Sequence, residues 1–221
     1  MQRKIITTAD NSHTLFVPEL NEHYHSIHGA LQESRHVFIE AGFKQVLNEE
    51  VKILEVGFGT GLNAVLTAIE AEETGRKTVY HTLEAYPVEA ELLEQLNYTT
   101  LLPKKHAPAF KTIHDAPWEK EVEISSPFSI KKIKSTVQQW KPENQYDLVY
   151  FDAFAPEKQP EMWTEAVFQK MYAALKPNGF LVTYCAKGSA KRAMKAAGFK
   201  VEALPGPPGK REMTKAVRMD A

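Results

Sequence analysis

Apolar and polar residues follow one another in blocks of two kinds along most of the chain. Short apolar runs predict buried strands, and longer stretches with apolar residues every three or four positions predict helices. The expected strands are 14–17, 51–56, 79–85, 147–151, 180–185, 199–204 and 212–217. The expected helices are 29–42, 62–73, 88–96, 161–175 and 189–197. Residues 100–145 have a weaker pattern, in which only a hairpin turning at 125–127 is recognisable.

The order of these elements predicts the fold class. Strands separated by helices of about ten residues or more imply parallel βαβ units. The last two strands are joined only by a Gly/Pro loop at 205–209, which requires an antiparallel pair at one sheet edge. We therefore expect a Rossmann-like α/β fold: a mostly parallel sheet with one antiparallel strand near its C-terminal edge and helices on both faces. One domain covers 1–221, with 1–45 as a cap or lid and 46–221 as the core.

Composition adds limits to this picture. A chain of 221 residues with 43% hydrophobic residues is long enough for one well-packed core. The only cysteine is Cys185, so no internal disulfide can form. The sequence contains no signal-peptide core and no run near the ~20 apolar residues of a membrane span. We expect a cytoplasmic protein without membrane contacts.

Charge is unevenly distributed along the chain. The net charge of −1 gives no indication of a nucleic-acid partner, but residues 187–221 carry nine Lys/Arg against three acidic residues. This basic segment predicts either a phosphate-binding surface or a solvated basic face. The candidates for phosphate contacts are Lys187, Lys191, Arg192, Lys210 and Arg211.

Three alternate glycines, Gly57, Gly59 and Gly61, connect the strand 51–56 to the helix 62–73. A glycine loop at the carboxyl end of a strand is a ligand-binding position in α/β sheets, and a purely structural turn would not need three glycines. A dinucleotide fold would require a small residue at the position of Leu62. The spacing instead resembles the first motif of class I methyltransferases, which bind S-adenosylmethionine. The predicted cofactor contacts in this segment are Glu55, Gly57, Phe58, Gly59, Thr60, Gly61 and Asn63.

Two further acidic residues end predicted strands. Glu84 follows the second strand of the core, where an acid accepts hydrogen bonds from ribose hydroxyls; the alternative is a surface glutamate. Asp152 ends the fourth strand and is followed by Phe154 and Pro156. An alkyl amine is mostly protonated at neutral pH, and a carboxylate here can hold it and accept its proton. Asp152 is therefore the candidate catalytic residue; the alternative is a helix cap.

Four segments, 31–38, 55–63, 152–163 and 209–213, together resemble the methyltransferases that form 5-methylaminomethyl-2-thiouridine in tRNA. That family comprises standalone MnmD and the N-terminal half of bifunctional MnmC. The resemblance implies methylation of the 5-aminomethyl group of a wobble (2-thio)uridine, in the anticodon region, with S-adenosyl-L-methionine as cofactor and no metal or FAD. We expect the flavin-dependent oxidase half of the bifunctional relative to be absent, so that other enzymes would supply the substrate. Implied substrate contacts are Glu33, Arg35, Phe154, Trp163, Lys210 and Arg211.

One segment departs from the family pattern. Many relatives carry an acid after the third strand that contacts the adenine of the cofactor, whereas residues 130–136 contain no acid. We expect Ser135, Thr136 or backbone groups to take over this contact.

Several alternatives remain open at this point. A class I methyltransferase acting on another amine, in a small molecule or a protein, fits the same motifs. An aminopropyltransferase shares the fold but needs a second acid shortly after Asp152, where this chain has residues 153–156 without one. A non-catalytic binding module would not need both the glycine loop and Asp152. A metal site at His23, His25 and His28 lacks an evident fourth ligand, so none is expected.

Overall fold

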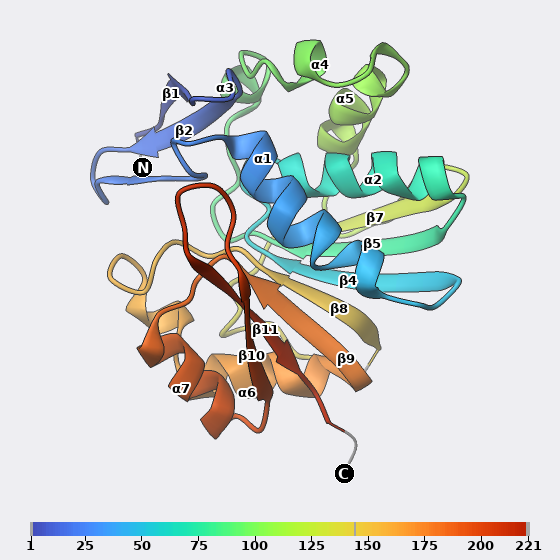
Figure 1. The fold of residues 1–221 in the computed structure, drawn as a ribbon. Helices are drawn as coiled ribbons and strands as arrows, with labels where there is room; N and C mark the ends of the chain where they lie inside the picture. The colour runs from blue at the N-terminus through green and yellow to red at the C-terminus, as the bar shows by residue number, and fades with distance from the viewer. Residues whose placement is uncertain (1, 144, 220–221) are drawn as a thin grey trace.

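The computed structural model describes residues 2–143 and 145–219, so the predicted domain limits at Met1 and Ala221 lie outside the described residues. An eight-stranded sheet with the order β10-β11-β9-β8-β4-β5-β7-β6 forms the centre of the molecule (Figure 1). Five neighbouring strands are parallel: β9 (Leu175–Thr183), β8 (Tyr146–Phe151), β4 (Glu50–Val56), β5 (Lys77–Leu83) and β7 (Phe128–Ile133). All six residues of β8 are buried, as expected for a central strand covered on both faces.

Both edges of the sheet contain antiparallel pairs. At one edge β11 (Glu212–Val217) is inserted between β9 and β10 (Lys200–Pro205) and is antiparallel to both. At the other edge β6 (Glu121–Ser125) forms a hairpin with β7, turning where the sequence predicts it. The predicted fold class is confirmed, and β6, the first strand of the predicted hairpin, adds a second antiparallel strand at the other edge of the sheet.

Helices cover both faces of the sheet (Figure 1). One face packs against the continuous helix formed by α1 (Ala30–Ser34) and the π-helix η1 (Arg35–Glu40), and against α2 (Leu62–Thr74) and α5 (Ala107–Asp115). The other face packs against α6 (Glu165–Ala174) and α7 (Gly188–Ala196). Short helical turns complete the chain: η2 (Phe43–Gln45), α3 (Ala90–Leu93), α4 (Tyr98–Leu101), η3 (Lys104–His106) and η4 (Pro160–Met162).

The N-terminal segment forms a small sheet of its own. Its strands are β1 (Lys4–Thr7), β2 (His13–Val17) and β3 (Glu22–His23). Arg3 ties this sheet to the core, because its guanidinium donates to the Tyr24 hydroxyl, the Glu89 carboxylate and the Tyr86 carbonyl oxygen. The sheet therefore lies as a cap at the carboxyl ends of the core strands.

The structure corrects several predicted boundaries. The helix predicted over 161–175 begins only at Glu165, because residues 160–162 form a 3-10 turn and the Thr164 hydroxyl caps the helix by accepting from the Val167 amide. The helix predicted over 88–96 is limited to α3, and the strand predicted over 79–85 lies two residues earlier. The strand predicted over 180–185 corresponds to β9, which already begins at Leu175 and contains Asn178 with φ +62°.

Candidate functional site

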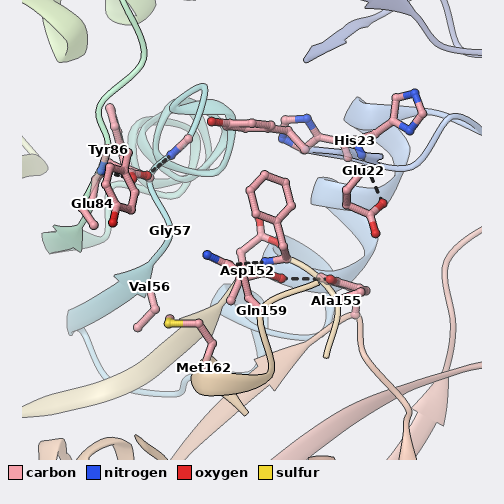
Figure 2. Close-up of a pocket in the computed structure, with 18 of the residues that line it drawn as sticks. Glu22, His23, Val56, Gly57, Glu84, Tyr86, Asp152, Ala155, Gln159 and Met162 are labelled. Carbon is pink, nitrogen blue, oxygen red and sulfur yellow. Dashed lines mark hydrogen bonds between the residues drawn. The ribbon is translucent and has the colours of Figure 1, made fainter. Parts of the chain in front are cut away.

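A pocket of about 710 Å³ lies at the carboxyl ends of β4, β5, β7 and β8, beneath the N-terminal cap. Figure 2 shows Glu84 and Tyr86 on one side of it, Glu22 and His23 on the opposite side, and Asp152 between them. The carboxyl ends of parallel strands are where α/β sheets bind ligands. Of the seven residues of the first motif predicted to contact a cofactor, five line the pocket: Gly57, Phe58, Gly59, Thr60 and Asn63.

The glycines of the loop are required by backbone geometry and crowding. Gly57, Gly59 and Gly61 have φ of +94°, +52° and +73°, a region that other residues rarely adopt. A Cβ on Gly57 would stand 2.5 Å from the carbonyl oxygen of Asp152, so this glycine lets the ends of β4 and β8 approach each other. A Cβ on Gly59 would stand 3.0 Å from the ring of Tyr24, which covers the loop from the cap. Gly61 is the N-cap residue of α2 and does not line the pocket.

Glu84 binds the glycine loop from the neighbouring strand. One carboxylate oxygen accepts from the Gly59 amide at 3.0 Å, and the other accepts from the Tyr86 amide at 2.8 Å. Each carboxylate oxygen can accept more than one hydrogen bond, so acceptor capacity remains toward the pocket that Glu84 lines. This arrangement suits a ligand that presents two neighbouring hydroxyl groups.

One amide group connects two acids at the floor of the site. The Asn63 Nδ2 donates to Asp152 Oδ2 at 2.9 Å and to Glu55 Oε1 at 3.1 Å. Glu55 is fully buried behind the pocket and also accepts from the Thr82 hydroxyl at 2.7 Å. Within the described part of the chain, the buried Asn63 Oδ1 has no hydrogen-bond partner. An unsatisfied acceptor in a pocket wall is a place for a donor from a ligand.

Burial changes the ionisation of both acids. Burial raises the pKa of Asp152 to about 7, and the hydrogen bond from Asn63 opposes this rise. Burial raises the pKa of Glu55 to about 8, against the hydrogen bond from Thr82. An acid with a pKa near neutrality is suited to exchange protons with a substrate.

The segment after β8 is held by side chains that the sequence analysis did not connect with it. The Tyr184 hydroxyl donates to the Ala153 carbonyl at 2.9 Å, and the Trp163 indole donates to the Phe154 carbonyl at 2.8 Å. Phe154 lines the pocket, and its ring meets the edge of Tyr24 at 5.1 Å between centroids. Trp163 is buried behind this segment and is not part of the pocket wall, so its contribution is to the position of Phe154.

Ser135 and Thr136 both line the pocket directly after β7. The Ser135 hydroxyl donates to the Thr136 carbonyl, and the Thr136 hydroxyl accepts from the Gln139 amide. The third parallel strand of the core therefore ends within the segment 130–136, and two hydroxyl-bearing side chains follow it at the pocket.

The residues predicted to contact substrate separate into two groups. Glu33 and Lys210 line the pocket and form an ion pair of 2.6 Å, in which Lys210 Nζ lies 3.9 Å from the centroid of the Tyr184 ring. Arg35 and Arg211 are solvent-exposed and lie outside the pocket wall. Lys210 is therefore not a free surface cation, as the basic segment alone suggested.

Other predicted phosphate contacts are also paired with acids. Lys187 pairs with Glu157 at 2.6 Å, and Lys191 pairs with Glu212 at 3.0 Å. Among the described residues, Arg192 and Arg211 are in no ion pair. The basic segment is thus neutralised in part by neighbouring carboxylates.

The described residues contain no group of three or more His, Cys, Asp or Glu side chains that could hold a metal ion. His25 is bonded to the Thr14 hydroxyl, and burial lowers its pKa to about 4, so this ring is neutral at pH 7. No helix in the described part of the chain is long and apolar enough to cross a membrane.

The fold and the pocket define a class I methyltransferase, and comparison with known proteins identifies the family. Residues 94–219 match the model of a family described as S-adenosyl-L-methionine-dependent methyltransferase, and the chain belongs to that family. The chain is similar to the bifunctional protein MnmC, which is named for tRNA 5-methylaminomethyl-2-thiouridine biosynthesis. The Cupriavidus metallidurans protein is 29% identical over 93% of this chain, and the Cupriavidus necator protein is 30% identical over 91%. The chain spans about a third of the length of these relatives (33% and 32%).

Solved structures give the same result for the fold. MnmC2 from Aquifex aeolicus superposes with a TM-score of 0.79 at 25% identity, over 98% of this chain and 70% of that one. Spermidine synthase from Thermotoga maritima superposes with a TM-score of 0.58 at 15% identity, over 98% of this chain and 69% of that one, a likeness of fold alone.

The pocket fits the cofactor that the family uses. The glycine loop leaves no space for side chains at positions 57 and 59, Glu84 offers acceptors for a diol, and Asn63 offers an unsatisfied acceptor for a donor group. S-adenosyl-L-methionine carries both a ribose diol and an α-ammonium group. Glu84 would hold the diol, and residues 57–60 with Asn63 would hold the amino-acid portion.

Proposed function

We propose that this protein methylates the primary amine of 5-aminomethyl-(2-thio)uridine at the wobble position of tRNA, forming 5-methylaminomethyl-(2-thio)uridine. The observation that carries the proposal is Asp152: a pocket carboxyl with a pKa near 7, at the end of the strand next to the glycine loop. The similarity to MnmC proteins and to MnmC2 supports the choice of substrate.

Bound S-adenosyl-L-methionine supplies an electrophilic methyl group. The substrate amine must present a lone pair to it, and Asp152 makes this possible by accepting a proton from the ammonium form. Asn63 fixes the carboxylate through Nδ2, so that the remaining oxygen of Asp152 is free for the amine. Phe154, held by Trp163 and Tyr24, offers an aromatic face to the uracil ring.

The proposal extends to the organisation of the protein. Within one domain, the N-terminal strands of the segment 1–45 cap the pocket, whereas its helix α1–η1 packs on the sheet of the core formed by 46–221. The anticodon region of tRNA approaches the pocket in the cytoplasm. Methyl transfer to an amine needs no electron transfer and no Lewis acid, so we propose that neither FAD nor a metal takes part.

Purified protein incubated with tritium-labelled S-adenosyl-L-methionine and aminomethyl-containing tRNA tests this function. Label should enter tRNA, and nucleoside mass spectrometry should identify the methylaminomethyl product. Label in protein or small-molecule fractions, with none in tRNA, would instead indicate a methyltransferase for another amine.

Asp152→Asn should lower the rate of methyl transfer by about two to four orders of magnitude, because the proton acceptor is lost. The dissociation constant for S-adenosylhomocysteine should stay within several-fold of the wild-type value. Asp115→Asn, which changes an exposed acid paired with Lys111, is the matched control and should keep wild-type turnover. Turnover near the wild-type rate in Asp152→Asn would show that Asp152 is structural.

A further inference from the structure

A lysine is buried beneath the glycine loop. Lys132, on β7, is only 2% exposed, although Lys is rarely buried without an acid partner. Within the described part of the chain no carboxylate forms an ion pair with it. Its Nζ donates to the His114 carbonyl at 2.6 Å and faces the rings of Trp118 and Phe58, at 5.1 and 5.8 Å from their centroids. Burial lowers the pKa of Lys132 to about 8, which shows how poorly this environment solvates the cation.

Two sets of contacts connect Lys132 with residues of the glycine loop that line the pocket. Phe58 is the residue between the first two glycines and is one of the residues that line the pocket, while its ring packs against His114 and Trp118. The second set involves His114, whose Nε2 lies 3.0 Å from the Thr60 carbonyl. Since a carbonyl can only accept, Nε2 carries the proton and His114 donates. Thr60 is the residue between the second and third glycines.

His114 also limits the position of the loop by contact. Its ring packs at a tilt against the Phe58 ring, with 5.4 Å between centroids, and its Nε2 would lie 2.8 Å from a Cβ on Gly61. Lys132 fixes the carbonyl of His114, and His114 fixes the loop. The loop is therefore supported from outside the pocket by a cation that touches neither the pocket nor the reacting groups.

We infer that Lys132 is a positioning residue for the cofactor, which acts by holding Phe58 and, through His114, Thr60 in the binding conformation of the glycine loop. This inference rests on the proposed cofactor site. A neutral apolar residue of the same length would fill the same space but would lose both the cation–π contacts and the donor to His114.

Calorimetry of S-adenosylhomocysteine binding to Lys132→Met tests the inference. The dissociation constant should rise about tenfold, in the range for a lost hydrogen bond from a charged group. The unfolding temperature without ligand should stay close to wild type, because the buried charge is removed together with its contacts. In steady-state kinetics with S-adenosyl-L-methionine varied and tRNA saturating, the KM for this cofactor should rise and kcat should not change. Lys131→Met, on the opposite face of the same strand, is the matched control and should bind as wild type does.

A second variant tests the hydrogen bond from His114 to the Thr60 carbonyl. His114→Phe keeps the ring against Phe58 but cannot donate to Thr60, so its affinity should also fall. The double variant should bind no more weakly than the weaker single variant, because both changes act on one loop. Wild-type affinity in Lys132→Met or in His114→Phe would overturn the inference. If Lys132→Met does not fold, the affinity of His114→Phe for S-adenosylhomocysteine alone tests the inference. Absence of binding to the wild-type protein would instead refute the proposed cofactor site.

Discussion

At the scale of single residues, the site depends on one side-chain amide shared by two carboxyl groups. Asn63 has two hydrogens on Nδ2 and gives one to Asp152 and one to Glu55. Glu55 lies behind the pocket wall, so its effect on the chemistry passes through Asn63. Burial of Glu55 also affects the stability of the protein, because the carboxyl group holds its proton much more tightly in the folded protein than in the unfolded chain.

We expect Glu55→Gln to change the pH dependence of stability. Glu55 has a pKa of about 8 when folded, against 4.5 in the unfolded chain. Between these values the folded state binds more protons, so wild-type stability falls as pH rises from about 4.5 to about 8. Glutamine has no such ionisation. Denaturant unfolding at pH 5 and pH 8.5 should therefore show that the variant gains stability relative to wild type at the higher pH. An equal difference at both values would contradict the raised pKa.

The sequence alone was sufficient to predict those site residues whose role follows from their immediate neighbours in the chain. The glycine loop, Glu84 and Asp152 each stand directly after an apolar strand, and the structure brings them to one pocket. Tyr24 and Tyr184 were missed because their contacts connect distant parts of the chain: Tyr24 covers Gly59, and Tyr184 binds the carbonyl of Ala153. An aromatic residue near a strand end is more often a core residue than a site residue, so composition gave no signal for them.

At the scale of elements, the parallel strands could be predicted because each is a compact apolar run. Helix α5 could not be predicted from the sequence. Three polar residues, 104–106, precede α5, and Pro108 stands near its start, so the segment reads as a loop. Proline is in fact tolerated in the first turn of a helix, where its missing N–H needs no partner. The sequence predicted a helix over 29–42 but not the π-helical geometry of η1, because the spacing of its apolar residues does not differ enough from that of an α-helix.

The loop between β10 and β11 presents Lys210 to the pocket. Gly209 has φ +84°, and a Cβ there would stand 2.4 Å from the ring of His28 in the cap. His36 Nε2 contacts the Pro205 carbonyl at 2.9 Å, so the loop packs against the cap and α1–η1 together (Figure 1). The position of Lys210 is therefore set by tight packing of the loop and by its ion pair with Glu33.

Gly209→Ala should move this loop and raise the KM for tRNA several-fold, while the affinity for S-adenosylhomocysteine stays unchanged. Gly75→Ala is the matched control: Gly75 has φ +67°, but nothing lies within 4 Å of an added Cβ. That variant should lose only about 1–2 kcal/mol of stability from backbone strain and keep its KM. Steady-state kinetics with tRNA as the varied substrate measure the KM of both variants. An equal KM in both variants would show that the loop does not contribute to tRNA binding.

At the scale of the whole molecule, a chain of net charge −1 is proposed to bind a polyanion. Pairing with acids removes Lys187, Lys191 and Lys210 from the candidate surface, which leaves the exposed Arg192 and Arg211. Arg211 follows Lys210 at the pocket, and the guanidinium of Arg192 reaches back toward Gly188 at the start of α7. Arg211 therefore directly follows a residue that lines the pocket, and Arg192 contacts the residue that follows the pocket-lining Lys187.

The double variant Arg192→Gln/Arg211→Gln should weaken tRNA binding and reduce its salt dependence. Each lost phosphate contact should lower the slope of log affinity against log salt by about 0.7–0.9. Filter binding across a salt series measures this slope. The control Lys120→Gln/Lys141→Gln removes two exposed lysines elsewhere and the same net charge. An unchanged slope in the arginine variant, or an equal change in the control, would assign the two arginines to a solvated face.

The position of β11 sets an order of folding. In the sheet β10 borders β11 alone, and β11 separates it from β9. During synthesis β10 emerges first, but it cannot join the sheet until residues 212–217 have also left the ribosome, and β9 remains an unpaired edge in the meantime. One late strand insertion then closes the edge of β9, docks β10 and brings the 205–211 loop against the cap. A nascent chain thus completes its pocket and covers the unpaired edge of β9 in the same event.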